Sequence, residues 1–230
     1  MKTIGLLGGM SWESTALYYQ IINQGVQARL GGLHSARLVV YSVDFYEIER
    51  LQAAGDWQTA AEKLAGAARA LQAAGADFIV LCTNTMHKVA PAIEAATSLP
   101  LLHIADATAG AVKSSGMRKV GLLGTRFTME QPFYKARLAE QHGIEVLVPN
   151  EAGRETVHQI IYQELCQGHI NAASREKYRA VMAELAARGA GAIIMGCTEI
   201  TLLIGKEDAE VPLFDTTHIH AEAAVALALA

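Results

Sequence analysis

The chain has 230 residues, a formal net charge of −4 and three cysteines, and 51% of its residues are hydrophobic. This length allows one large α/β domain or two small ones, but no hydrophobic run approaches the ~20 residues that span a membrane. Dispersed basic residues argue against nucleic acid as a partner, and cysteines without a CxxC pair argue against a disulfide framework or a zinc site. We expect a cytoplasmic protein with reduced thiols and no membrane association.

Short aliphatic runs alternate along the chain with longer, Ala-rich stretches of helical periodicity. The predicted strands are residues 3–7, 37–43, 78–82, 101–104, 119–123, 145–149, 192–195 and 211–214. The predicted helices are residues 12–29, 57–74, 129–141, 156–166 and 174–188. This alternation predicts parallel sheet covered by helices on both faces.

Three sequence blocks occur twice in the same order. They are GLLG at residues 5 and 121, GADFIVLCT and GAGAIIMGC at 75 and 189, and LPLL and VPLF at 99 and 211. The alternative is coincidence among common strand–turn sequences. We predict an α/β fold of two similar doubly wound parallel-sheet domains, related by a pseudo-two-fold duplication, with the active site in the cleft between them. The expected domains are 1–105 plus 212–230, and 106–211, so that the last strand and helix return to the first half.

The repeat indicates which residue of the CTNT stretch is functional. Aligning GADFIVLCT with GAGAIIMGC pairs Thr83, not Cys82, with Cys197. Both positions end a predicted parallel strand, where open α/β sheets bind ligands. Successive strand residues face opposite sides, so we expect Cys82 to be a small buried hydrophobe. Thr83 and Cys197 are the predicted pair of acid/base residues on the two faces of one carbon, with a buried structural thiol as the alternative for Cys197.

Four stretches, GLLGGMSWEST, CTNTMH, GLLGTRFTMEQPFY and GCTEI, resemble the aspartate/glutamate racemase family, which is independent of pyridoxal phosphate. The resemblance covers essentially the whole chain and is especially close to members that are specific for L-aspartate and L-glutamate or have broad specificity. It implies an amino-acid substrate, no cofactor and a homodimer. The histidines, including His218 and His220, show no metal-ligand pattern, so we expect no metal.

The family uses two catalytic cysteines, one per half, and here the first is replaced by Thr83. The resemblance gives Cys197 the role of base for the L-enantiomer and places Thr83 on the opposite side. A hydroxyl is a much weaker acid than a thiol and therefore a poor base in the reverse direction. We accordingly expect L-to-D conversion to be favoured.

Residues beside the two catalytic positions are expected to support them. Asn84, Thr85 and Thr198 can hold a substrate carboxylate together with the backbone amides that follow each strand. Glu199 either orients and charge-balances the Cys197 side or only favours its helix N-terminus. His87 either does the same near Thr83 or is a solvated or capping side chain.

The resemblance also places residues of other loops near the substrate. Met10 and Ser11 follow the Gly8-Gly9 turn, although Ser11 would equally serve as a helix cap, and Thr125 and Thr128 occupy the corresponding turn of the second half. In the expected closing loop, from residue 44 to residue 52, either Arg50 or Gln52 can contact the distal carboxylate. The Gly8-Gly9 turn is not GxGxxG, so a dinucleotide site is not expected.

Four rival functions remain open from the sequence. The same scaffold could carry a decarboxylase or a cis-trans isomerase of dicarboxylates. A non-catalytic protein that binds dicarboxylates or amino acids is kept open by the replaced cysteine. Broad amino-acid specificity is kept open by the absence of a basic residue that the family often has near residues 165–167.

Overall fold

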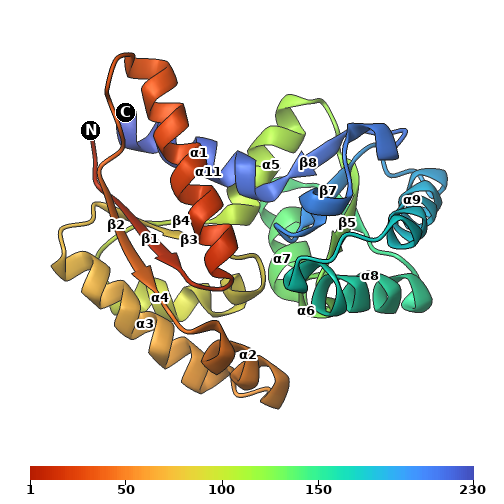
Figure 1. Ribbon diagram of the computed structural model, residues 1–230, viewed down its shortest axis with the longest axis horizontal. Helices are drawn as coiled ribbons and strands as arrows, with labels where there is room; N and C mark the ends of the chain where they lie inside the picture. Colours follow the sequence, from red (N-terminus) through yellow and green to blue (C-terminus); the bar gives the residue numbers. More distant parts are fainter. The chain divides into compact units, whose positions relative to one another are not determined.

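The computed structural model describes residues 1–230 as two four-stranded, all-parallel sheets (Figure 1). The first sheet has the order β2-β1-β3-β4, formed by β1 (Ile4–Gly8), β2 (Leu38–Ser42), β3 (Phe78–Leu81) and β4 (Leu101–Leu102). The second has the order β6-β5-β7-β8, formed by β5 (Lys119–Gly124), β6 (Glu145–Leu147), β7 (Ile193–Gly196) and β8 (Leu213–Asp215). The predicted fold class, two similar parallel α/β halves, is confirmed.

Eleven α-helices and several shorter helical turns connect these strands. The α-helices are α1 (Trp12–Leu30), α2 (Phe45–Ala54), α3 (Trp57–Ala73), α4 (Ala90–Ala96), α5 (Ile104–Ser114), α6 (Arg126–Glu130), α7 (Pro132–Ala136), α8 (Glu151–Gln163), α9 (Ala172–Ala187), α10 (Ile200–Leu203) and α11 (Thr216–Leu229). The short turns are η1 (Thr85–Val89), η2 (Arg137–Gln141), η3 (Leu165–Gln167) and η4 (Lys206–Asp208).

The helix predicted over residues 129–141 is divided into three pieces. Gln131 is extended, with ψ 150°, and Pro132 begins α7. A residue before proline avoids the helical region, and proline has no N–H to continue the preceding helix. Helix α8 begins at Glu151, earlier than predicted, because the Asn150 side chain accepts a hydrogen bond from Gly153 N–H as its N-cap.

The blocks that repeat in the sequence occupy equivalent places in the two sheets. In the first sheet Gly5 pairs with Ile79, and in the second Gly121 pairs with Ile193. The third block repeats as well, because Ile79 pairs with Leu101 as Ile193 pairs with Leu213. The duplication is therefore a repeat of strand pairing as well as of sequence.

The chain divides into two compact units, Met1–Ile104 with His220–Ala230, and Ala105–Ile219. The prediction that the last strand returns to the first half is wrong, because β8 pairs with β7 in the second sheet. The duplication explains this: β8 is the copy of β4, which closes the first sheet. Most of α11 does belong to the first unit, whereas α5 belongs to the second.

Both faces of the first sheet are buried by helices. One face carries Ile4, Leu6 and Val80, packed with residues of α1 and α11, and the other carries Leu7 and Leu81, packed with residues of α3. Figure 1 shows α3 and α4 on one side of this sheet and α1 with α11 on the other. Cys82 is fully buried with the α1–α11 face, so its predicted place in the core is confirmed.

The second sheet buries one face against three helices. Leu123, Ile193 and Met195 pack with apolar residues of α8, α9 and α10. The same face holds Tyr178 of α9, which is fully buried. Cys197 packs against this cluster at the end of β7.

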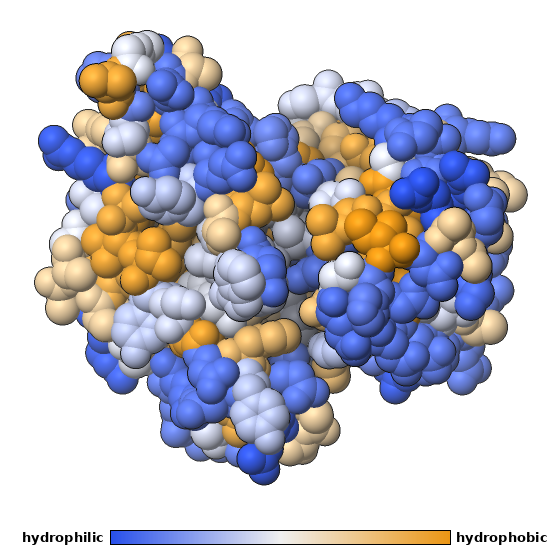
Figure 2. All heavy atoms as spheres, in the orientation of Figure 1, coloured by the Kyte–Doolittle hydropathy of each residue, from blue (hydrophilic) through white to orange (hydrophobic).

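Apolar side chains also reach the surface of the first unit, near the open edge of its sheet. Figure 2 shows an apolar area over β1 and β2, and on the edge strand β2 Val40 is 45% and Tyr41 42% exposed. An apolar edge strand of this kind is a common contact surface between chains. The homodimer implied by the resemblance stays a prediction. None of the helices is both long and apolar enough to cross a bilayer.

A buried histidine ties α11 to the first sheet. His220 is fully buried; its Nδ1 accepts a hydrogen bond from Tyr18 Oη at 2.8 Å, and its Nε2–H donates to the Leu102 carbonyl at 2.8 Å. With Nδ1 as acceptor and Nε2–H as donor, the imidazole is neutral and carries its proton on Nε2. Burial lowers the pKa of His220 to about 4, against a weaker opposing effect of the Leu102 carbonyl.

The folded chain should lose stability as the pH falls from about 6.5 to about 4. In this range the unfolded state protonates His220 and the folded state does not, which lowers the free energy of unfolding by about 3 kcal/mol by pH 4. Urea denaturation at several pH values measures the slope. The decrease of the free energy of unfolding with falling pH should be smaller in His220→Gln and unchanged in His34→Gln, because His34 is exposed. Equal slopes in both variants would contradict the assignment.

Candidate functional site

In each sheet the next two strands along the chain lie on opposite sides of the first strand. Open α/β sheets bind ligands at the carboxyl ends of the two neighbouring strands where the connections diverge in this way. The strand orders place these switch points between β1 and β3 and between β5 and β7. Thr83 follows β3 and Cys197 follows β7. Because Leu7 pairs with Leu81 and Leu123 with Met195, the two residues occupy the same position in their halves.

Glycines let the backbone approach closely at both switch points. A Cβ on Gly8 would lie 2.4 Å from the Thr15 side chain, and Gly9 has φ +89° with a would-be Cβ 2.2 Å from the Val43 carbonyl oxygen. In the second half a Cβ on Gly124 would lie 2.9 Å from the Gly196 carbonyl oxygen. Neither turn accommodates a side chain at these positions, so glycine is required for the close packing of both strand ends.

Thr15, which the sequence analysis did not single out, closes the turn after β1. Its hydroxyl accepts a hydrogen bond from Gly9 N–H at 2.8 Å and donates to the Ser11 carbonyl at 3.0 Å. Ser11 Oγ accepts from Ser14 N–H and is the N-cap of α1, so the capping alternative describes its role in this structure. Met10 is buried against the α3 face of the sheet.

The end of β3 separates two neighbouring side chains as predicted. Cys82 is fully buried with its thiol directed at the Val80 carbonyl, 3.6 Å away, and burial raises the pKa of this thiol. Thr83 is half-buried. Cys82 is therefore a packed thiol, and Thr83 is the residue of the pair that solvent can reach.

His87 holds the backbone of Thr83. Its Nδ1 lies 2.7 Å from the Thr83 carbonyl oxygen, and its Nε2 accepts a hydrogen bond from Ile104 N–H at 3.2 Å. This pair of partners assigns the neutral tautomer with the proton on Nδ1. The side chain is only 2% exposed, with the His103 ring 4.4 Å away between centroids. His87 is thus a buried bridge between the ends of β3 and β4 and not a solvated or capping residue.

The side chain of Gln52 points into the first unit, whereas that of Arg50 lies at the surface. Gln52 is buried, and its Nε2 lies 2.9 Å from the sulfur of Met86 in η1, the turn that also contains Thr85. Arg50 is exposed, with its guanidinium 5.8 Å from the centre of the Tyr46 ring. Gln52, not Arg50, reaches the segment after β3.

The residues after Thr83 are enclosed by the first unit. Asn84 and Thr85 are 5% and 7% exposed, and the Asn84 carbonyl accepts a hydrogen bond from His87 N–H. The first unit therefore gathers Thr83, Asn84, Thr85 and His87 with Gln52 around one strand end.

Glu199 contacts the thiol of Cys197. The sulfur lies 2.9 Å from Glu199 Oε2, and the carboxylate makes no capping bond to α10. Burial and the Glu199 carboxylate raise the pKa of Cys197 well above its ordinary value. Of the two alternatives for Glu199, the structure supports the one that orients the cysteine.

Thr198 pairs with a residue that the sequence analysis missed. Its Oγ1 lies 2.9 Å from Oγ1 of Thr217, which is 1% exposed in the first turn of α11. The third repeated block gave a signal, because it places Thr216-Thr217 just after the end of β8. The two hydroxyls join the ends of β7 and β8.

Thr125 and Thr128 form the start of α6. Thr125 Oγ1 accepts from Thr128 N–H as the N-cap, and the two hydroxyls lie 3.2 Å apart. Both side chains are buried, Thr128 completely. Their place beside β7 follows from the pairing of Gly124 with Gly196, and the predicted substrate contact stays a prediction.

Comparison with known proteins gives consistent relatives. The sequence model described as Asp/Glu/hydantoin racemase matches residues 7–224. The chain is 25% identical to the broad-specificity amino-acid racemase RacX of Bacillus subtilis (strain 168), over 99% of this chain and 98% of the relative.

Two solved structures match the whole of both chains. A protein from Yersinia pestis, assigned as an Asp/Glu racemase, is 63% identical with a TM-score of 0.95. An aspartate racemase homologue from Pyrococcus horikoshii OT3 is 35% identical with a TM-score of 0.87.

Replacing Glu199 by Gln should make Cys197 more reactive. The substitution removes the negative charge that helps to raise the pKa of the thiol, so the thiolate fraction at neutral pH increases. The rate of alkylation by iodoacetamide between pH 6 and pH 10 measures this, in a Cys166→Ser background because Cys166 is exposed. The exposed carboxylate variant Glu210→Gln is the matched control. An unchanged or slower rate in Glu199→Gln would contradict the assigned contact.

Proposed function

Because the chain belongs to the Asp/Glu/hydantoin racemase family, whose members are isomerases, we propose that it interconverts the enantiomers of aspartate and glutamate without a cofactor. The proposal rests above all on one observation. Thr83 and Cys197 stand at the same register position of the two halves, each at a carboxyl strand end beside a switch point. In this proposal they are the acid/base pair, on opposite faces of the substrate α-carbon.

Racemisation without a cofactor needs one group to remove the α-proton and another to deliver a proton to the opposite face. Cys197 removes the proton of the L-enantiomer as a thiolate, and Thr83 donates a proton or passes one on from water. Removing the proton of the D-enantiomer would use Thr83 as the base. The proposal therefore requires that both side chains reach one bound substrate.

The contact with Glu199 makes the thiolate of Cys197 a stronger base. A thiol of raised pKa is rarely ionised at pH 7, but its thiolate, once formed, binds a proton more tightly. The α-proton of an amino acid is very weakly acidic, so the stronger base lowers the barrier to its removal. Glu199 Oε2, 2.9 Å from the sulfur, is placed to accept the thiol proton. This transfer moves the negative charge from the carboxylate to the sulfur, where the substrate ammonium can stabilise it.

The preference for L-to-D conversion has a thermodynamic limit. Enantiomers have equal free energies in water, so kcat/KM must be equal in the two directions. The asymmetry between Cys197 and Thr83 can therefore appear only in kcat and KM separately. We propose that kcat is larger from the L-enantiomer.

Broad amino-acid specificity is the second candidate. RacX, a relative over nearly the full length, is described as a broad-specificity racemase. In this chain η3 consists of the buried Leu165, the exposed Cys166 and Gln167, and it has no basic side chain to bind a distal carboxylate. The buried amide of Gln52 is the alternative partner for that carboxylate and would accept neutral side chains too.

Replacing Cys197 by Ser should abolish racemisation of aspartate and glutamate, with a loss of at least about a hundredfold in kcat. Chiral chromatography after incubation with each enantiomer measures the rate, and a panel of neutral amino acids tests the breadth of specificity. Mass spectrometry in heavy water detects α-deuterium, which a decarboxylase would not introduce into aspartate or glutamate. Ala180→Ser, which introduces a serine at an exposed position of α9, is the control and should keep the wild-type rate.

Two outcomes would contradict the proposal. Equal rates in wild type and Cys197→Ser would remove Cys197 from the chemistry. Thermal stabilisation of wild type by aspartate without any exchange of the α-hydrogen would favour a non-catalytic amino-acid binding protein.

Replacing Thr83 by Cys should raise kcat for D-to-L conversion by on the order of tenfold or more, because a thiolate is far more accessible than an alkoxide. The ratio of the two kcat values should move towards unity. Thr83→Ser, which keeps the hydroxyl, should retain the wild-type ratio. A larger kcat from the D-enantiomer in wild type, or no change in Thr83→Cys, would count against the role of Thr83.

A further inference from the structure

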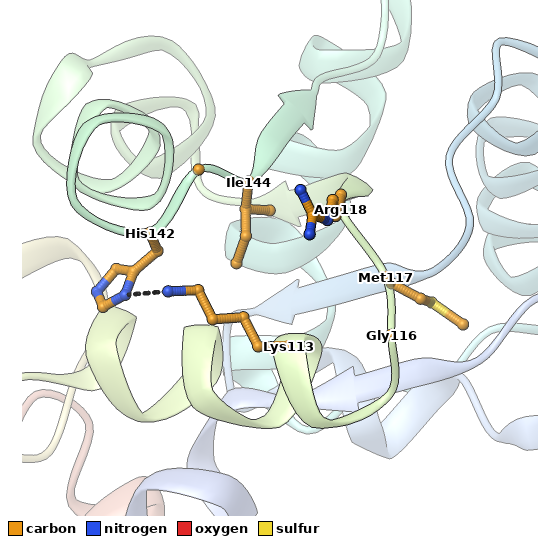
Figure 3. Close-up of a pocket in the computed structure, with 7 residues that line it drawn as sticks. Lys113, Gly116, Met117, Arg118, His142 and Ile144 are labelled. Atoms are coloured by element: carbon orange, nitrogen blue, oxygen red, sulfur yellow. Dashed lines mark hydrogen bonds between the residues drawn. The ribbon is translucent and has the colours of Figure 1, made fainter.

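A pocket of about 400 Å³ lies in the second unit, away from the strand ends that carry Cys197 and Thr125. Figure 3 shows it between the end of α5, the turn that leads into β5, and the turn between η2 and β6. Its lining residues are Lys113, Gly116, Met117, Arg118, His142, Gly143 and Ile144. It opens at the amino ends of β5 and β6, which is the opposite edge of the sheet from the candidate site.

The ammonium group of Lys113 is oriented by a chain of polar contacts. Arg137 holds Asp106 through two bonds of 2.7 Å, and the same carboxylate accepts from His142 Nε2 at 2.8 Å. The other ring nitrogen of His142 then accepts from Lys113 Nζ at 3.3 Å (Figure 3). Each group fixes the next, so the exposed Lys113 side chain is held beside His142 at the rim of the pocket.

The charge around the pocket is positive, although the whole chain carries −4. The two carboxylates beside it are already paired, Asp106 with Arg137 and Glu145 with Lys119 at 3.0 Å. Arg118 makes no hydrogen bond or ion pair with its side chain. Lys113 and Arg118 therefore present two cationic groups that no carboxylate neutralises.

Backbone hydrogen bonds reduce the opposing charge of the helix end. The last carbonyls of α5 would normally carry a partial negative charge towards the pocket. Those of Val112 and Lys113 accept hydrogen bonds from Met117 N–H at 3.3 Å and Gly116 N–H at 2.9 Å. The turn after α5 thus leaves the two cations as the main electrostatic feature.

We propose that this pocket binds the phosphate group of a small anionic ligand. Phosphate carries nearly two negative charges at neutral pH, which matches one ammonium and one guanidinium better than the single charge of a carboxylate. The Arg118 fork can bind two oxygens of a phosphate group, and Lys113 adds a second positive charge to the lining. Ile144 gives the pocket an apolar wall for the remainder of a phosphomonoester. This site is independent of the proposed racemase chemistry.

Isothermal titration with orthophosphate, glycerol phosphate and succinate, at constant ionic strength, tests the site on the full chain. Both phosphates should bind, and Lys113→Met and Arg118→Met should each raise Kd by about tenfold or more. Lys177→Met is the matched control: it removes an exposed cation of α9 and should keep the wild-type Kd. Tighter binding of glycerol phosphate than of orthophosphate would identify an ester as the ligand.

Equal phosphate affinity in the two pocket variants and in Lys177→Met would overturn the proposal, since any binding would then be elsewhere. Succinate binding as tight as phosphate, and equally sensitive to Lys113 and Arg118, would overturn the assignment to phosphate. Unchanged melting temperatures of the variants without phosphate verify that they fold. Amide shifts of Gly116 and Gly143 on phosphate addition give a second readout at the pocket itself.

Discussion

The pairing register of β1 with β3, and its copy between β5 and β7, fixes which side chains stand at the strand ends. Side chains alternate along a strand, so a shift of one residue would expose Cys82 and bury Thr83. Apolar residues on both faces of β3 resist such a shift, because each buried aliphatic side chain contributes about 1.5–3 kcal/mol. Gly8 and Gly124 add a steric limit, since they allow close contacts at the switch points that no other residue would allow.

Duplication preserved this backbone and changed the chemistry attached to it. The strand-end position holds a hydroxyl in one half and a thiol in the other, and two residues later Thr85 corresponds to Glu199. The side chains that hold the two strand ends in place differ as well. The first half fixes its strand end with a buried neutral histidine, His87, and the second with a carboxylate on the sulfur and a pair of threonines. The same scaffold thus carries two groups of very different acidity.

The strands, the repeat and the positions of Thr83 and Cys197 could be predicted because they depend on local patterns: aliphatic runs, glycine turns and self-similarity. The role of Glu199 could not, because the sequence left open whether it orients Cys197 or only favours its helix N-terminus. Residues two apart do not face each other on a helix, and only the tight turn after β7 brings them together. The bridge from Thr83 through His87 to Ile104, and the pairing of Thr198 with Thr217, join segments distant in sequence. No local pattern specifies such contacts.

Helix α5 follows the first sheet along the chain but belongs to the second unit, whereas most of α11 follows the second sheet but belongs to the first. This arrangement affects how the chain can fold during synthesis. Residues 220–230 of α11 cover one face of the first sheet, and the Lys2 N–H donates to the Ala228 carbonyl at 2.8 Å. On the ribosome β1 and α1 are made first, yet α11, the second helix on that face of the sheet, emerges only after every strand of both sheets. The earliest sheet is therefore the last to be completed, and the apolar surface that α11 later covers is the part that a nascent-chain chaperone would shield.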